Sequence, residues 1–390
     1  MRKKLRNLIV AGLALVLALS LVAGACAPAA PEEAAEEVAA LESELAAEKS
    51  KVSSLQGEVA DLEGEIAELR APAEVYEWKF QTWATPGDMA FKSYAYTLDQ
   101  VRAASDGRID GELFGVGVLV GAVEALEAEG AGIIDGSFGF GGYYGGYDTA
   151  FVIMGHGATL WPDRSALDLW YEQFGGRELF RELYAGHNVY YIGPMTIGSE
   201  AINSTVPLRN VEDLQGVNIR MGGGGFGAEV FTRLGATIVF LPGGEIYSAL
   251  DTGLVDAAEY LGPGVNWDLG FHEVTDYFLY PTPHGTTIST DWTLNMDVWK
   301  GLPDDLKDFL EVASYAAGEN FFSMTTAYDY KAIEWMIDYG LEQITWPPEE
   351  FDKVTEMALE VALEYKEKSP MCDKIITSQF DYWRYIGHIE

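Results

Sequence analysis

Residues 215–263, QGVNIRMGGGGFGAEVFTRLGATIVFLPGGEIYSALDTGLVDAAEYLGP, contain the pattern that decides the fold. The spacing of their apolar residues alternates between strand and helix periods. This pattern predicts, in order, a strand at 217–220, a helix around 230–234, a strand at 237–241, a short helix from 245 and a strand ending near 259–260. Arg220 and Glu259 each fall at the C-terminal end of an apolar strand. Ligands of open α/β sheets bind at that end, and a guanidinium there suits a carboxylate or a phosphate.

The same alternation extends over the rest of the chain from residue 76. It predicts strands at 78–82, 108–114, 135–140 and 189–193, and helices near 90–104, 120–129, 166–174 and 178–187. Alternating strands and helices indicate parallel strands joined by crossover helices. More than 300 residues exceed one comfortable sheet, so we expect two lobes. The last third is mostly helical, with helices predicted at 303–339 and 348–367.

The N-terminus has the features of an export signal. Four basic residues lie before an apolar run from 8 to 22, which is too short for a comfortable membrane span. Gly24 and Ala25 precede Cys26, which is typical of a lipoprotein signal and predicts that Cys26 carries lipid; an ordinary signal peptide with an incidental cysteine is the alternative. The only other cysteine is Cys372, so we expect no internal disulfide.

Residues 31–70 repeat in heptads, and nine of the ten seam positions are apolar, with Glu48 as the exception. Branched residues dominate the a positions and leucine the d positions, which favours a parallel two-stranded coiled coil and hence a homodimer. A single charged helix that serves as a stalk is the alternative. The net charge of −36 argues against nucleic acid as a partner. An anionic ligand would need a local arginine or a bound metal to overcome that field.

Several short motifs resemble one known family. The stretch GVNIR at 216–220, RLGA at 233–236, the pattern E-x-Y-x-A-L-x-x-G at 245–253 and VDAAE at 255–259 resemble the solute-binding proteins of tripartite ATP-independent periplasmic (TRAP) transporters. The resemblance runs from about residue 77 to the C-terminus. The segment AEYLGPGVNWDLGFHEV, residues 258–274, is most similar to the branch that binds 2-oxo or 2-hydroxy acids with a metal ion.

The resemblance implies an α/β, periplasmic-binding-protein-like clam with hinge strands and long C-terminal helices, behind an N-terminal coiled-coil helix. It divides the chain into a lipoprotein signal peptide (1–25), a tether and coiled-coil stalk (26–72) and a solute-binding domain (76–390). Lobe I would comprise about 76–196 plus 286–325, and lobe II about 197–285 plus 326–390. Both lobes would close over the ligand.

The candidate site residues come from strand ends and from the resemblance. Arg220 is expected to pair with the ligand carboxylate, with an internal salt bridge as the alternative. Glu259 is expected to bind a metal, and Tyr260 follows it where the family usually has tryptophan. Glu200 stands where the family usually has glutamine, contacting both ligand and metal. The candidate pocket wall consists of two further aromatic residues, Trp83 and Tyr144.

Other patterns in the same chain have alternative interpretations. Residues 222–227 match G-x-G-x-x-G, but Arg220 interrupts the preceding strand, so a better role is to bring backbone N–H groups near an anion. The five histidines lack metal-ligand spacing, which predicts surface or packing roles. With no catalytic motif present, we expect no enzyme and no catalytic cofactor, although a calcium or sodium ion is expected with the ligand.

The expected partners are a small organic acid, the membrane subunits of an ion-gradient-driven TRAP permease, and the membrane itself through the lipid anchor. The protein is expected to be exported and to face the periplasm or the cell exterior. Two alternatives use the same lobes. In one, the protein is a ligand-sensing receptor component coupled to a membrane signalling protein, and in the other it is a cell-surface hydrolase.

Overall fold

The computed structural model describes residues 32–69, 74–153, 158–222 and 225–389. The predicted signal peptide and Cys26 lie outside the described residues. The chain forms two units, Met1–Ala73 and Glu74–Glu390. None of the helices that the structure describes is both long and apolar enough to cross a membrane.

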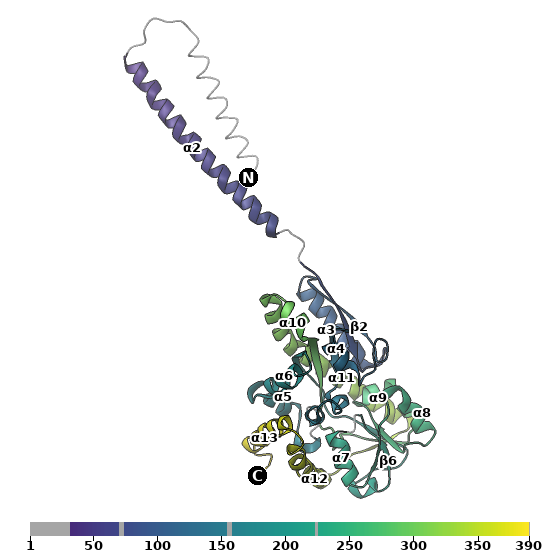
Figure 1. Cartoon of the computed structure of the whole chain (residues 1–390). Coiled ribbons are helices and arrows are strands. Elements are labelled where there is room, and N and C mark those ends of the chain that lie inside the picture. Colours follow the sequence, from purple (N-terminus) through teal and green to yellow (C-terminus); the bar gives the residue numbers. More distant parts are fainter. Residues whose placement is uncertain (1–31, 70–73, 154–157, 223–224, 390) are drawn as a thin grey trace. The chain divides into compact units, whose positions relative to one another are not determined.

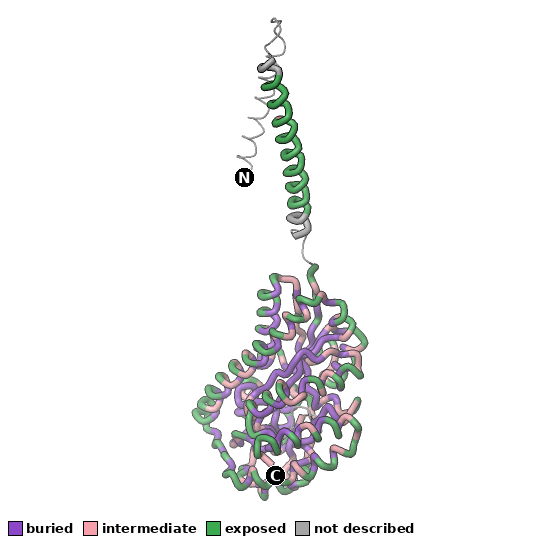
Figure 2. Tube along the Cα trace, turned by 90° about the vertical axis from the view of Figure 1, so that its left-hand side faces the viewer, coloured by how far each residue is buried: buried purple, intermediate pink, exposed green. Residues whose placement is uncertain are grey.

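The described part of the first unit is one helix, α2 (Glu32–Leu69), of 38 residues. Its apolar seam faces solvent in the single chain, as the exposed tube in Figure 2 shows. Leu41, Leu55 and Leu62 are 49%, 54% and 55% exposed. The predicted helix is confirmed, and pairing of its seam with a second copy stays a prediction.

The second unit contains two mixed sheets (Figure 1). The first has the order β2-β1-β3-β10-β4, with strands at Ile109–Phe114, Tyr76–Thr82, Gly136–Gly139, Ser289–Asn295 and Val189–Thr196. The second has the order β11-β9-β5-β8-β6-β7, with strands at Glu342–Ile344, Tyr277–Leu279, Ile202–Ser204, Ala257–Glu259, Asn218–Arg220 and Thr237–Val239.

The expectation of parallel strands is correct for most pairs and wrong for two strands. β10 runs antiparallel to β3 and β4, and β5 runs antiparallel to β8 and β9. The reason is that the chain changes sheet just before each of these two strands. It leaves the first sheet after β4 to form β5, and it returns from β9 of the second sheet to form β10. These links carry no crossover helix that would enforce parallel pairing.

The helices cover the sheets and agree with most of the predicted ranges. They are α3 (Met89–Ala104), α4 (Ala125–Gly130), α5 (Arg164–Gln173), α6 (Gly176–Ala185), α7 (Phe226–Arg233), α8 (Ile246–Asp251), α9 (Pro263–Asp268), α10 (Met296–Gly301), α11 (Asp304–Tyr339), α12 (Pro348–Lys366) and α13 (Pro370–Tyr385). α4 is shorter than predicted. α13 was not predicted, although Ser369 caps it by accepting from the backbone N–H of Cys372.

The apolar core joins the two sheets. Phe80 of β1 belongs to the same buried cluster as Ala258 of β8, and Tyr191 of β4 shares another with Ile219 of β6. The long helix α11 packs against β4, α3 and α9. Cys372 is a free, buried cysteine on α13. The two sheets therefore pack as one body, with their strands buried together (Figure 2). The lobe boundaries stay a prediction.

Candidate ligand-binding site

The candidate site begins at the carboxyl edge of the second sheet. β6 and β8 are parallel neighbours, and Arg220, the last residue of β6, pairs in register with Ala258 of β8. Glu259 follows directly as the last residue of β8. Both side chains therefore start from the edge at which ligands of open α/β sheets are held.

Arg220 is completely buried, and the protein uses only part of its guanidinium group. Its Nε donates to the main-chain oxygen of Leu241 at 3.0 Å, and its Nη1 donates to the main-chain oxygen of Glu259 at 2.6 Å. Its Nη2 is buried and has no hydrogen-bond partner among the residues that the structure describes. A buried donor without a partner costs free energy, so the guanidinium has hydrogen-bonding capacity left for an anion.

Glu259 lies against Arg220 from the neighbouring strand. Its Oε1 lies 3.3 Å from Arg220 Nη1 and also accepts a short hydrogen bond from the backbone N–H of Gly222. The internal salt bridge that was the alternative for Arg220 is thus present, but it does not occupy Nη2. The glycine-rich turn, where described, brings a backbone N–H to a carboxylate of the protein itself.

Aromatic residues close a small cavity around this pair, with a volume of about 20 Å³. The ring of Trp83 meets that of Tyr260 edge-on at 5.7 Å, and the Arg220 guanidinium lies 5.3 Å from the centre of the Tyr260 ring. The described lining residues are Trp83, Phe140, Tyr143, Glu200, Arg220, Gly222, Glu259, Tyr260, Leu261, Ile288 and Thr290.

Tyr143 lines the cavity, and Tyr144, which the sequence favoured, does not. Tyr144 is buried with its ring edge-on to Phe151 at 5.6 Å. Both tyrosines lie in a 3-10 helix, η1 (Gly141–Tyr144). Successive side chains of such a helix point about 120° apart, so only one of two neighbours can face the cavity. Burial raises the pKa of Tyr143, and nearby Arg220 opposes that rise.

Asp291 of β10 anchors this 3-10 helix from outside the cavity. Its Oδ2 accepts from the backbone N–H of Gly141 at 2.9 Å and from the Tyr184 hydroxyl at 2.8 Å. Burial raises the pKa of Asp291 to about 7, and the two hydrogen bonds oppose the rise. Asp291 therefore positions the segment that presents Tyr143, and it does not line the cavity itself.

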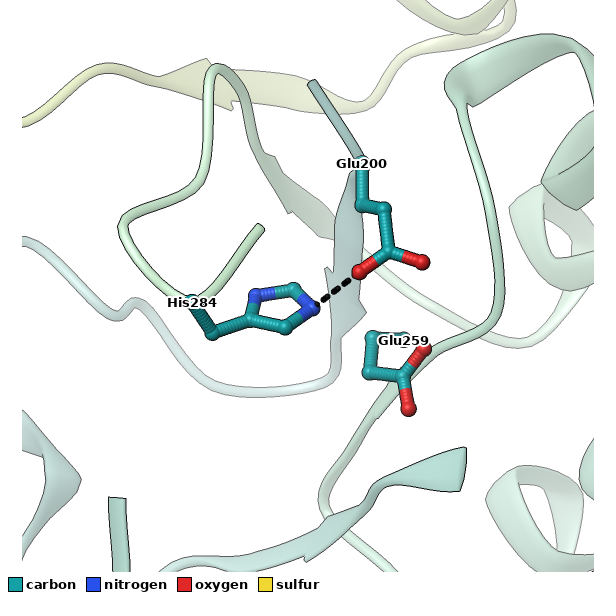
Figure 3. Close-up of side chains that lie close together, drawn as sticks. All are labelled: Glu200, Glu259 and His284. Atoms are coloured by element: carbon teal, nitrogen blue, oxygen red, sulfur yellow. Dashed lines mark ion pairs between the residues drawn. The ribbon is translucent and has the colours of Figure 1, made fainter. Parts of the chain in front are cut away.

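Glu200 and His284 come from two of the links between the sheets. Glu200 lies between β4 and β5, and its backbone N–H donates to the main-chain oxygen of Gly285 at 2.9 Å. His284 lies between β9 and β10, and its Nε2 is 2.7 Å from Glu200 Oε2. Figure 3 shows this contact, with Glu259 beside it. Both side chains are at most 1% exposed.

The sequence did not identify His284 as a site residue. The structure places it in the interior, where its ring also meets Phe231 edge-on at 5.7 Å. Burial lowers the pKa of His284 to about 4, more than nearby Glu259 raises it. A single histidine in an irregular link has no spacing signal. Only the return of the chain from one sheet to the other brings it to Glu200.

The second unit is a two-sheet α/β fold, and it buries the Arg220 guanidinium and two carboxylates beside the links between its sheets. This is the architecture of an extracellular solute-binding protein. The family model for bacterial extracellular solute-binding protein, family 7 (DctP) matches residues 80–368. The chain belongs to this family, which provides the solute-binding proteins of TRAP transporters. The resemblance and the fold class drawn from the sequence are therefore confirmed. The family acts outside the cytoplasm.

Three relatives illustrate the match. The chain is 26% identical to the monocarboxylate 2-oxoacid-binding periplasmic protein of Nostoc sp. over 289 residues, 73% of this chain and 77% of the relative. An apo, open TRAP periplasmic solute-binding protein from Rhodobacter sphaeroides is 30% identical, with a TM-score of 0.66, covering 80% of this chain and 99% of that chain. A Bordetella bronchiseptica TRAP solute-binding protein with copurified calcium and picolinate is 24% identical, with a TM-score of 0.73, covering 81% and 95%.

Proposed function

We propose that the protein captures a small monocarboxylic acid, of the 2-oxo or 2-hydroxy class, and delivers it to an ion-gradient-driven TRAP permease. The observation that carries this proposal is that Arg220 lines the cavity and that its buried Nη2 has no hydrogen-bond partner in the described part of the chain. A guanidinium nitrogen with unused N–H groups suits a carboxylate oxygen. The Nostoc relative, which binds monocarboxylate 2-oxoacids, supports the ligand class.

The charges around the cavity favour a cation beside the acid. Among the described lining residues, Arg220 supplies one positive charge and Glu200 and Glu259 two negative charges. A divalent cation and a monocarboxylate together would bring the sum to zero, whereas sodium would leave one uncompensated negative charge. Buried charges are costly unless they are compensated. Of the calcium and sodium that the sequence suggested, the charges thus favour a divalent ion.

Glu200 has a specific part in this proposal. By its resemblance to the family, it stands where glutamine usually contacts ligand and metal, and the cavity includes it. The extra negative charge favours a divalent ion and disfavours an acid with a second carboxylate. Trp83, Tyr143 and Tyr260 then form the wall that limits the size of the acid.

We further propose that the protein binds its ligand without transforming it. No serine or cysteine is present among the described residues that line the cavity, and Arg220 and Glu259 suit holding ions better than transferring protons. Two competing functions would use the same cavity. In the first, ligand binding leads to contact with a membrane sensor. In the second, the protein hydrolyses a substrate at the cell surface.

The test is calorimetry and thermal unfolding with pyruvate, lactate, acetate and succinate, with and without divalent cations, while product analysis follows each acid in parallel. We expect pyruvate or lactate to bind one per chain with a divalent ion, succinate to bind poorly, and no acid to be converted. Conversion of any acid would establish an enzyme. Failure of every carboxylate to bind would remove the ligand assignment.

Delivery is proposed to depend on a tether at the N-terminus. Lipid on Cys26 would hold the protein at the membrane, and α2, about 57 Å long at 1.5 Å per residue, would serve as a stalk. Tethering raises the effective concentration near the permease. Cys26→Ser should therefore release soluble protein that binds ligand normally but supports uptake poorly at low abundance. Full uptake by this variant at matched abundance would show that the anchor is dispensable.

A further inference from the structure

The starting observation is a cluster of three potential metal ligands in the interior of the second unit. Glu200, Glu259 and His284 each offer one ligand atom, and these atoms all lie within 4.8 Å of one another. Two ligands of one ion, with bonds of about 2.0–2.6 Å, lie at most roughly 4–5 Å apart. The three side chains are thus close enough to share one ion. Figure 3 shows them converging from three separate segments.

The cluster is built into the fold. All three residues are at most 2% exposed, and each belongs to a different segment: the link from β4 to β5, the end of β8 and the link from β9 to β10. Gly285 leaves room for the Glu200 carboxylate, because a Cβ at Gly285 would lie 2.5 Å from Glu200 Oε2. The donors are therefore held by backbone that is itself ordered by the packing of the two sheets.

A second, independent observation points to a ligand at this place. Arg220 lines the same cavity as Glu200 and Glu259, and its buried Nη2 has no hydrogen-bond partner within the described ranges. A metal held by three protein ligands keeps coordination positions for an exogenous ligand. An acid bound there would bring its carboxylate to the one donor that the protein leaves unused.

The chemistry of the donors determines the class of ion. Calcium and magnesium take oxygen ligands, whereas imidazole suits zinc and other first-row transition metals. One imidazole nitrogen with two carboxylate oxygens is a mixed nitrogen and oxygen set. Such a set favours a transition-metal ion over the calcium or sodium expected from the sequence.

We propose that Glu200, Glu259 and His284 form a site for one divalent first-row transition-metal ion, such as Zn²⁺, Co²⁺ or Mn²⁺, on which the organic acid chelates. This inference rests on the proposed function for the acid but assigns the ion class and adds His284 as a ligand. The contact of 2.7 Å between His284 Nε2 and Glu200 Oε2 widens when the ion binds, because two ligands of one small ion lie roughly 3 Å apart or more.

The test titrates the full mature chain, stripped with a chelator, with ZnCl2, CoCl2, MnCl2 and CaCl2 by calorimetry before any acid is added. We expect one zinc per chain, bound at least about tenfold more tightly than calcium. His284→Gln should lower zinc affinity at least about 100-fold and leave calcium affinity within about threefold. Visible absorption of the Co²⁺ form gives a second readout, because its bands shift when a nitrogen ligand is lost.

Two further variants keep the result interpretable. His187→Gln, which changes a half-buried histidine outside the cluster, should bind zinc like the parent. Glu259→Gln should lose zinc binding even if His284→Gln folds poorly, with circular dichroism as the check on folding. Zinc binding that survives both site variants, or calcium bound more tightly than zinc, overturns the proposed site.

The outcomes also separate this inference from the proposed function. Zinc bound through His284 with no affinity for pyruvate or lactate would retain the metal site and remove the acid. Pyruvate bound with calcium, unaffected by His284→Gln, would retain the acid and remove the transition-metal site.

Discussion

Replacement of Arg220 by lysine tests the central contact of the proposed site. The parent guanidinium donates through Nε to Leu241 and through Nη1 to Glu259, and its Nη2 has no hydrogen-bond partner among the described residues. A lysine ammonium is a single point charge at the end of a flexible stem. If the lysine ammonium keeps the contact with Glu259, it can no longer donate to Leu241. It also cannot replace Nη2, the nitrogen proposed to hold the acid.

The expected magnitudes separate binding from stability. The lost bond to the partly buried Leu241 carbonyl should lower the free energy of unfolding by about 1 kcal/mol. Loss of the charge-assisted hydrogen bond from Nη2 to a carboxylate in a closed cavity should cost about 1.5–3 kcal/mol of binding, or roughly 10- to 150-fold in affinity. The variant should therefore fold normally and bind weakly.

The assay is calorimetry with pyruvate and lactate at a saturating divalent cation, together with thermal unfolding of the free protein. Arg233→Lys is the matched control. Arg233 makes two hydrogen bonds to Glu364, at 2.8 and 2.6 Å, on the surface and away from the cavity lining. Arg233→Lys should bind like the parent. If Arg220→Lys also binds within about threefold of the parent, Arg220 is a structural partner of Glu259 and the reasoning fails.

Three further predictions concern the site, the interior and the stalk. Gly285→Ala should displace the Glu200 carboxylate, because the new Cβ would lie 2.5 Å from Glu200 Oε2. Calorimetry should then show cation binding weakened at least about tenfold. The control Gly301→Ala, which has open space around the new Cβ, should bind the cation like the parent. Burial raises the pKa of Glu129 to about 8 in the folded protein, so its contribution to stability is complete below about pH 4.5 and is lost as the pH rises through 8. Glu129→Gln should make the fall of unfolding free energy between pH 5 and 8 shallower by up to about 1.4 kcal/mol per pH unit, and an unchanged slope in denaturant titrations would contradict this. Leu55→Asp should convert a dimer of the unlipidated chain to a monomer in light scattering, and a parent that is monomeric at all concentrations would remove the coiled coil.

Local patterns in the sequence predict the structure best where they have a geometric consequence. The C-terminal ends of parallel strands lie at one edge of a sheet, so the sequence alone predicts that Arg220 and Glu259 lie near each other. Their contact at 3.3 Å agrees with that placement, and their role in binding is still a proposal. The heptads likewise predicted a long helix, which α2 confirms over Glu32–Leu69.

Other features depend on contacts between residues far apart in the chain. The antiparallel pairing of β10 follows from the return of the chain from the second sheet to the first, which no local pattern encodes. Tyr143 and Tyr144 are the same residue type at adjacent positions, so the sequence does not distinguish them. The orientation of the 3-10 helix that contains both places Tyr143, and not Tyr144, in the cavity lining.

The sequence by itself therefore determined most of the secondary structure, the family and the strand-end pair of Arg220 and Glu259, because those depend on periodicity and on short motifs. Only the tertiary structure placed His284 beside Glu200. The two residues are separated by 84 positions and lie in irregular links, and they meet because each link crosses between the same two sheets at the same place.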